Sequence, residues 1–225
     1  GLQQNPCRPA VQRGGRGYYT GGGRLDCSCR LPPARRRLEP LISKQEANFM
    51  KPIETDRLIL RNFRRQDAGG LLAYLKSPVA SCFLSLTLQD IDAATTEADR
   101  RASDDAEIAV CLKESDELIG DLFAHPEDDT VSVGWNFNPG NAGRGYAFEA
   151  AHALFADLFQ VKGIRRLYAY VEDHNLASQK LCERLGMRRE GLFLDYISFR
   201  NDDAGQPIYE NTMQYALLRR EWNSL

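Results

Sequence analysis

No stretch of the sequence approaches the roughly 18 consecutive apolar residues that a membrane-spanning helix needs. The first residues also lack the apolar segment that forms the centre of a secretory signal peptide. We therefore expect a cytoplasmic protein without membrane contact. Its 43% of hydrophobic residues is enough for a substantial core, and a length of 225 residues fits one domain with an appendage, or two small domains.

Cysteine and histidine are few and scattered. The six cysteines do not form the framework of a small secreted scaffold, so we expect free thiols rather than disulfides. Cys27 and Cys29 have no second pair at the spacing of a zinc site. His125, His152 and His174 are also too far apart in the sequence to suggest zinc, so no metal is expected.

The net charge of −2 conceals an uneven distribution. Residues 1–50 carry nine Arg or Lys and three Asp or Glu, whereas the remaining residues carry 20 basic and 28 acidic side chains. An acidic folded domain would attract cationic partners. The same excess of charge also serves solubility, and both interpretations stay open.

Residues 1–49 are rich in Gly, Arg and Pro and show no apolar period, which predicts a flexible extension outside the folded domain. Arg/Gly repeats can bind RNA through charge and stacking, so a nucleic-acid-binding arm is the alternative to a non-functional extension. Met50 directly precedes the first predicted strand and is a candidate native start. The folded domain is predicted over residues 50–225.

From residue 50 onward, apolar periodicity predicts alternating strands and helices. Strands are predicted at 57–63, 106–112, 117–123, 130–137, 165–171, 191–200 and 208–218. Helices are predicted at 66–76, 90–102, 144–160 and 175–185. Asp90 is a candidate N-cap of the second helix. This order predicts an α/β (α+β) fold with a mixed sheet and helices on both faces.

The most informative stretch is the glycine-rich turn in Asn138-Pro-Gly-Asn-Ala-Gly-Arg-Gly-Tyr-Ala-Phe-Glu-Ala150, between a predicted strand and a predicted helix. Gly143 and Gly145 allow the backbone to come close to an anion, and the free N–H groups and dipole of the helix N-terminus favour negative charge there. A Rossmann loop would need a third glycine where Phe148 stands, and a Walker loop would need Gly-Lys-Ser/Thr. The turn therefore predicts another kind of phosphate-binding loop.

The segment resembles motif A of the GNAT N-acyltransferase superfamily, Gln/Arg-x-x-Gly-x-Gly/Ala. Gly145 and Ala147 match its small-residue positions, and Ala142 stands where Gln or Arg is usual. Residues 168–187 resemble motif B, with Asn175 and Ser178 at the Asn-x-x-Ser/Ala positions and Leu-Gly-Met ending the helix. Residues 53–63 resemble the first strand of the branch that acetylates the N-termini of ribosomal proteins. The resemblance covers residues 51 to about 222.

The resemblance implies the GNAT fold, with a mixed, mostly antiparallel central sheet whose splayed strands form an acetyl-CoA cleft. Backbone amides of residues 143–147 would hold the pyrophosphate, strand 132–137 would pair with the pantetheine arm, and Asn175 would bond to that arm. The implied cofactor-binding residues are Trp135, Phe137, Asn138, Ala142, Gly143, Arg144, Gly145, Tyr146, Ala147 and Asn175. The alternatives are an ordinary central strand with buried aromatics, and Asn175 as the N-cap of its own helix.

Three residues are candidates for catalysis. Ser178 would protonate the departing thiolate directly or through water, unless it is an ordinary surface serine. Cys182 occupies the place of the family's tyrosine acid and would act as a proton donor or, in principle, a nucleophile, although a cysteine within a helix usually belongs to the core. Ser132 stands where related enzymes carry a glutamate base.

The base is therefore sought elsewhere, at Glu172, Asp173 or His174, or in a chain of water molecules. The acceptor is expected to bind near residues 77–90 and 201–206, where Asp202 and Asp203 would attract a cation or simply form a solvated turn.

The resemblance implies an acetyl-CoA-dependent N-acetyltransferase without a metal. It would transfer the acetyl group directly, in a ternary complex, to a primary amine on a protein N-terminus or a small molecule. A monomer or a homodimer is expected. The alternatives are an acyl-CoA-binding module with little catalysis, and an RNA- or ribosome-associated protein that acts through the Arg/Gly arm.

Overall fold

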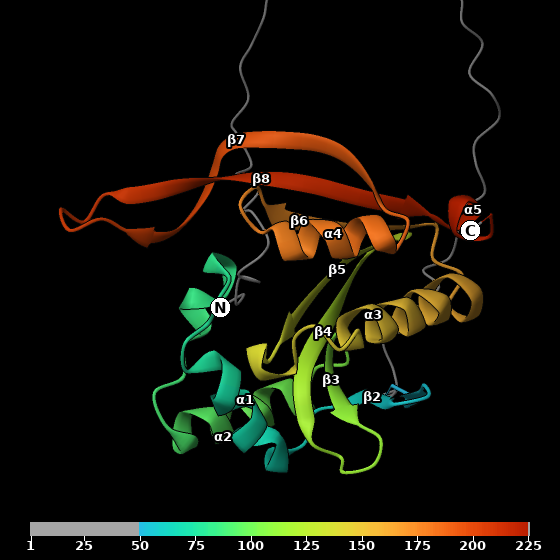
Figure 1. The fold of residues 1–225 in the computed structure, drawn as a ribbon, viewed down its shortest axis with the longest axis horizontal. Helices are drawn as coiled ribbons and strands as arrows, with labels where there is room; N and C mark the ends of the chain where they lie inside the picture. Colours follow the sequence, from blue (N-terminus) through green and yellow to red (C-terminus); the bar gives the residue numbers. More distant parts are fainter. Residues whose placement is uncertain (1–49, 225) are drawn as a thin grey trace, which may run out of the picture. The chain divides into compact units, whose positions relative to one another are not determined.

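The computed structural model describes residues 50–224, so the predicted extension over residues 1–49 lies outside the described residues. A mixed sheet of eight strands in the order β1-β2-β3-β4-β5-β6-β8-β7 forms the centre of the domain (Figure 1). Its strands are β1 (Ile53–Glu54), β2 (Leu58–Asn62), β3 (Glu107–Leu112), β4 (Leu118–Glu127), β5 (Thr130–Phe137), β6 (Arg166–Glu172), β7 (Arg188–Asn201) and β8 (Pro207–Leu218). All neighbouring strands are antiparallel except β5 and β6, which are parallel. The predicted mixed fold is confirmed.

Helices cover both faces of the sheet, as predicted. The α-helices are α1 (Ala68–Leu75), α2 (Ile91–Ala102), α3 (Tyr146–Ala156), α4 (Leu176–Arg184) and α5 (Arg219–Trp222). Short turns of other types are η1 (Arg65–Asp67), η2 (Ser81–Leu86), η3 (Pro139–Asn141) and the π-helical turn η4 (Asp157–Val161). Helices α1 and α2 lie on one side of strands β3 and β4, and α3 lies on the other (Figure 1).

Two apolar clusters correspond to these two faces. The larger cluster joins the inner faces of α3 and α4 to the sheet, through residues such as Leu154, Phe155 and Leu181. The smaller cluster packs α1, α2 and η2 against the opposite face, where Leu71 and Phe83 are buried. The apolar side of the helix predicted over residues 144–160 therefore faces the sheet.

Side-chain caps fix where two of the helices begin. The Asp90 carboxylate accepts a hydrogen bond from the backbone N–H of Ala93 at the start of α2 (2.9 Å), and the Asn175 side-chain oxygen accepts one from the N–H of Ser178 at the start of α4 (3.2 Å). Each bond satisfies an N–H that has no partner within its helix. The predicted N-cap role of Asp90 is confirmed. None of the helices described over residues 50–224 is long and apolar enough to span a membrane.

The feature that positions the site is the divergence of the two parallel strands. β5 and β6 pair only from Thr130–Arg166 to Ser132–Tyr168. Beyond Ser132, β5 keeps its pairing with β4 as far as Phe137, while β6 continues beside β8 as far as Glu172. The edges of β5 and β6 that face each other are therefore unpaired beyond this point.

Candidate active site

A cleft with a cavity volume of about 460 Å³ occupies the space between the diverging strands. This volume is within the range of small-molecule sites, about 300–1,000 Å³. The cleft is lined by β5 and β6, by α4, by the turn that precedes α3 and by the chain around the start of η2. It therefore brings together the two segments that resemble motifs A and B.

The turn before α3 has the backbone geometry of an anion cradle. Gly143 and Gly145 have φ angles of +76° and +81°, a conformation that side-chain-bearing residues rarely adopt. A Cβ atom at Gly143 would meet no heavy atom within 4 Å, so the backbone there is open to a ligand. Because α3 begins at Tyr146, its first N–H groups and its dipole add to the attraction for an anion.

Most of the predicted cradle residues line the cleft, namely Ala142, Gly143, Gly145, Tyr146 and Ala147. Arg144 is not among the lining residues. Its carbonyl oxygen instead accepts a hydrogen bond of 3.0 Å from Nη1 of Arg57. The contribution of Arg144 to the site is therefore a backbone contact that holds the turn.

Arg57 and Glu149 form a clamp behind this turn. The Arg57 Nε and Nη2 atoms lie 2.7 and 2.6 Å from Oε2 of Glu149, whose Oε1 accepts hydrogen bonds from the Arg57 N–H and the Thr55 hydroxyl. The guanidinium also lies 4.6 Å from the ring centroid of Tyr146. Burial raises the pKa of Glu149, but the hydrogen bonds from Thr55 and Arg57 outweigh burial and leave that pKa lowered. The Glu149 carboxylate therefore favours its ionised form, and the Arg57 guanidinium balances its charge beside the cradle.

The unpaired edge of β5 forms another wall. Trp135 and Phe137 line the cleft, as predicted, and so does Asn136, whose buried Nδ2 atom has no hydrogen-bond partner. Asn138 does not line it. The Asn138 side-chain oxygen caps η3 by accepting a hydrogen bond from the N–H of Gly140 at 3.0 Å.

Ser178 projects from the first turn of α4 into the cleft. The indole Nε1–H of Trp135 donates a hydrogen bond to its Oγ at 3.1 Å, which joins β5 to α4. This bond occupies a lone pair of the hydroxyl and leaves its hydrogen for a group in the cleft. Asn175 also lines the cleft while capping α4, so the two roles considered for it are compatible.

The structure separates the other two catalytic candidates from Ser178. Cys182 is fully buried in the larger core cluster and does not line the cleft, and burial raises the pKa of its thiol to about 12. Ser132 is also buried, and it lies in the paired part of β5, opposite Tyr168. Neither side chain reaches the cleft, so we give neither one a role in the reaction.

Among the three possible bases, only Glu172 lines the cleft. Its Oε1 accepts a hydrogen bond from the N–H of Cys82 (3.1 Å), and its Oε2 lies 3.4 Å from Nδ2 of Asn175. The Asp173 carboxylate is bonded to the Asn211 amide at 2.8 Å. His174 is exposed, 3.7 Å from Asp173.

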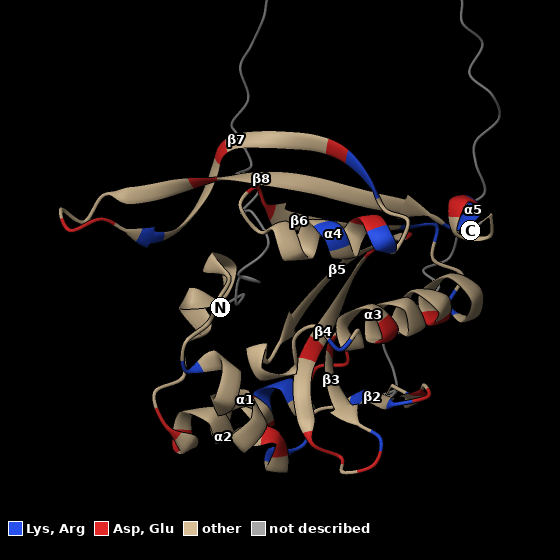
Figure 2. Cartoon of the chain, viewed as in Figure 1, with Lys and Arg blue, Asp and Glu red and all other residues tan. Residues whose placement is uncertain are grey.

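Sequence reasoning missed two cations on the α4 wall. Lys180 and Arg184 both line the cleft, and they account for the basic segments of α4 in Figure 2. The guanidinium of Arg184 lies 4.3 Å from the ring centroid of Phe148, which keeps this charge beside the cradle. Their spacing of four residues places them on one side of a helix, a signal that the sequence did contain.

The predicted acceptor regions differ in their relation to the cleft. Val79, Ala80, Cys82 and Phe83, at and just before η2, line it. No residue of the turn 201–206 does, and this acidic turn lies at the tip of the β7–β8 hairpin (Figure 2). Within residues 50–224, no group of three or more His, Cys, Asp or Glu side chains is placed to hold a metal ion.

Residues 57–188 match the family model described as acetyltransferase (GNAT) domain. The chain belongs to the GNAT acetyltransferase family. The GNAT domain is similar to YnaD, an uncharacterized N-acetyltransferase of Bacillus subtilis, with 29% identity over 174 residues that cover 76% of this chain and 99% of YnaD. The family assignment makes the protein an acyltransferase enzyme.

Solved structures agree with this assignment. An acetyltransferase (GNAT family) from Bacillus anthracis superimposes with a TM-score of 0.68 and 25% identity, over 76% of this chain and 99% of that one. The ribosomal-protein-S5-alanine acetyltransferase of Vibrio fischeri gives a TM-score of 0.55 at 14% identity, over 76% and 98% of the two chains, which is a likeness of fold alone.

Proposed function

We propose that this GNAT domain transfers an acetyl group from acetyl-CoA to a primary amine, directly and in a ternary complex. The observation that carries the proposal is the cleft between β5 and β6, which joins an unpaired strand edge to a glycine cradle at a helix N-terminus. An unpaired edge suits the amide groups of a pantetheine arm, and the cradle suits a diphosphate. Acetyl-CoA carries both groups, and it supplies the thioester.

The residues then divide into three tasks. Backbone N–H groups of residues 143–147 hold the diphosphate, and Lys180 and Arg184 add positive charge to the same cleft. The open edge of β5 orients the arm along Trp135 and Phe137. The Ser178 hydroxyl, oriented by Trp135, gives its proton to the leaving thiolate.

The acceptor is a protein N-terminus or a small amine. One observation favours a protein N-terminus: residues 53–63 resemble the first strand of the branch that acetylates the N-termini of ribosomal proteins. A cytoplasmic location and a monomeric or dimeric state remain predictions.

Calorimetric titration of the full chain with CoA tests the donor, using a matched pair of glycine variants. Gly143 and Gly205 have φ angles of +76° and +79°, and a Cβ atom would meet nothing within 4 Å at either one. Gly143→Glu and Gly205→Glu therefore carry the same backbone strain, but only Gly143→Glu places a carboxylate in the cradle. We expect at least a tenfold loss of CoA affinity in Gly143→Glu and none in Gly205→Glu.

Equal CoA affinity in these two variants would refute the cradle assignment. Thiol release from acetyl-CoA is then followed with small primary amines and with peptides that begin with Ala or Ser. Turnover with the peptides and not with the small amines identifies a protein N-terminus as the acceptor, and the reverse result identifies a small molecule.

A further inference from the structure

One buried carboxylate in the domain lacks a cation. Four acidic side chains of residues 50–224 are at least nine-tenths buried, namely Asp67, Asp121, Glu172 and Glu210. Asp67 lies 2.8 Å from Arg61, and Asp121 lies 3.2 Å from Arg101. Within these described residues Glu172 has no basic group within 4 Å, and its partners are the Cys82 N–H and the Asn175 amide. Buried charges are normally paired, so Glu172 is the exception.

Two acceptors without a hydrogen-bond partner lie on the same face of the sheet as Glu172. Thr212 of β8 is paired with Glu172 of β6, so their side chains are cross-strand neighbours, and the buried Thr212 Oγ1 has no hydrogen-bond partner. Glu210, two residues before Thr212, points to the same face. Its Oε1 lies 3.8 Å from the exposed Arg200, while its buried Oε2 has no hydrogen-bond partner. We call Glu172, Glu210 and Thr212 the acid pocket.

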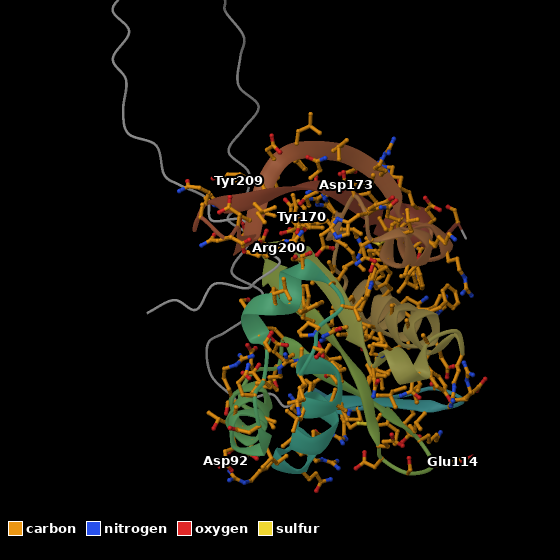
Figure 3. All side chains as sticks on the ribbon, turned by 60° about the vertical axis from the view of Figure 1, so that its left-hand side comes forward. Asp92, Glu114, Tyr170, Asp173, Arg200 and Tyr209 are labelled. Atoms are coloured by element: carbon orange, nitrogen blue, oxygen red, sulfur yellow. The ribbon has the colours of Figure 1, made fainter. Side chains whose placement is uncertain are left out.

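A small cavity opens at the acid pocket. It has a volume of about 20 Å³. Glu172, Thr212, Tyr170 and Tyr196 are among its lining residues, whereas Glu210 lies behind Thr212 on the same face and does not line it. One water molecule, or a group of that size, needs about 10–15 Å³. Figure 3 labels Tyr170, which lines the cavity, and Arg200, which faces Glu210, at the end of the domain opposite Asp92 and Glu114.

The cavity adjoins the cleft, because both are lined by Cys82, Tyr170, Val171 and Glu172. Glu172 also contacts Asn175, which caps the turn that carries Ser178. A group bound here therefore lies beside the wall that holds the proposed proton donor.

We propose that the acid pocket binds the acceptor as an unbranched primary ammonium group and that Glu172 removes its proton. This inference rests on the proposed function. An ammonium group is close in size to water and carries three donors, so it fits the cavity and matches the two acceptor side chains that line it, Glu172 and Thr212. The rings of Tyr170 and Tyr196 add a surface that attracts cations.

The proposed reaction balances as follows. Glu172 takes one proton from the ammonium group and passes it to water, and the freed lone pair forms the C–N bond at the thioester carbonyl carbon. The C–S bond then breaks. Ser178 gives its hydroxyl proton to the thiolate and takes the second proton from the new amide nitrogen.

A thermal-shift experiment on the full chain tests the pocket without requiring turnover. The probes are n-propylammonium chloride and tetramethylammonium chloride at equal concentration, each with and without CoA. We expect propylammonium to raise the Tm of the wild type by at least 1 °C more than tetramethylammonium, which is too large for the cavity. Glu172→Gln should abolish the difference, and Glu190→Gln, which lies outside the pocket between Arg166 and Arg188, should keep it. Equal shifts by both salts in the wild type overturn the proposal.

Thr212→Val gives a second, independent readout. Because the Thr212 hydroxyl is buried without a partner, we expect valine to raise Tm by about 2–4 °C in the absence of ligand. The same variant should lower the affinity for propylammonium at least threefold. A variant that is more stable and still binds propylammonium as the wild type does would show that the hydroxyl does not serve a ligand, and would overturn its place in the pocket.

Turnover separates this inference from the proposed function. With any amine that the wild type acetylates, Glu172→Gln should lower kcat about 100-fold and leave CoA affinity unchanged. Normal CoA binding without a propylammonium shift rejects the acid pocket alone. A wild type that does not bind CoA rejects the proposed donor, and the propylammonium thermal shift then still tests the pocket.

Discussion

The Arg57–Glu149 clamp should control the affinity for the donor, and Arg57→Gln is the variant that shows it. Arg57 connects the chain just before β2 to the cradle through Glu149 and the carbonyl of Arg144. Glutamine keeps part of the length of the side chain but loses its charge and its fork of donors. It also leaves the Glu149 carboxylate unpaired next to the place proposed for the diphosphate.

The magnitude follows from the contacts. The Arg57 side chain is half exposed, so its ion pair with Glu149 is worth about 1 kcal/mol despite the short distances. The hydrogen bond to the Arg144 carbonyl contributes about 1 kcal/mol more. Because both contacts order the turn that binds the diphosphate, we expect a loss of about 1–2 kcal/mol in CoA binding, or roughly a 5–30-fold increase in Kd.

Calorimetry with CoA and steady-state kinetics measure the effect. The KM for acetyl-CoA should rise while kcat stays within about twofold, since the clamp does not touch the thioester. Arg57→Gln combined with Glu149→Gln should bind CoA better than Arg57→Gln alone, because the unpaired carboxylate is removed. Arg166→Gln, which breaks the pair with Glu190 outside the cleft, is the control. Unchanged CoA affinity in Arg57→Gln would refute the reasoning.

Two further predictions concern stability. A Cβ atom at Gly134 would lie 2.1 Å from Cζ of Phe123, so Gly134→Ala should destabilise the domain by about 1–3 kcal/mol in urea unfolding, and a smaller residue at position 123 should recover part of the loss. Burial raises the pKa of Glu107 from 4.5 to about 7, although the nearby Arg101 lowers it. Between these two pH values Glu107 is therefore protonated in the folded protein and ionised in the unfolded chain. The free energy of unfolding of the wild type should therefore fall as the pH rises through this window. The Glu107→Gln variant should gain up to about 3 kcal/mol in stability relative to the wild type between pH 5 and 8. The same pH dependence of stability in both proteins would contradict the raised pKa.

The sequence predicted the long elements because their apolar periodicity and caps are local. The helix that begins after Asp90 and the meander of three strands are where the patterns placed them. Sequence patterns missed β1, which has two residues, and η2, which has no apolar period of its own. η2 owes its place to tertiary contacts, with Phe83 in the smaller core cluster and Cys82 bonded to Glu172, 90 residues away.

The site could be predicted where its chemistry lies in the backbone of one turn. Gly143 and Gly145 indicated an anion cradle because their conformational freedom is a property of the residues themselves. The clamp could not be predicted, since Arg57 and Glu149 are 92 residues apart and nothing in either neighbourhood indicates the other. Cys182 was predicted to take part in the reaction because of its position in motif B, but α4 directs its side chain into the core. The motif position alone does not reveal this direction.

The acid pocket helps to decide between two functions of the cleft, which are binding an acyl donor alone and catalysing acyl transfer. In the proposed function the donor is held by the cradle and the open edge of β5, and both would work without Glu172, Glu210 or Thr212. A buried carboxylate without a cation and a buried hydroxyl without a partner each cost folding free energy. Asp67 and Asp121 show that the same fold supplies an arginine to other buried acids. A cation delivered from solution would offset the cost at Glu172, and an amine acceptor is the cation that the proposed acetyl transfer would bring to this place.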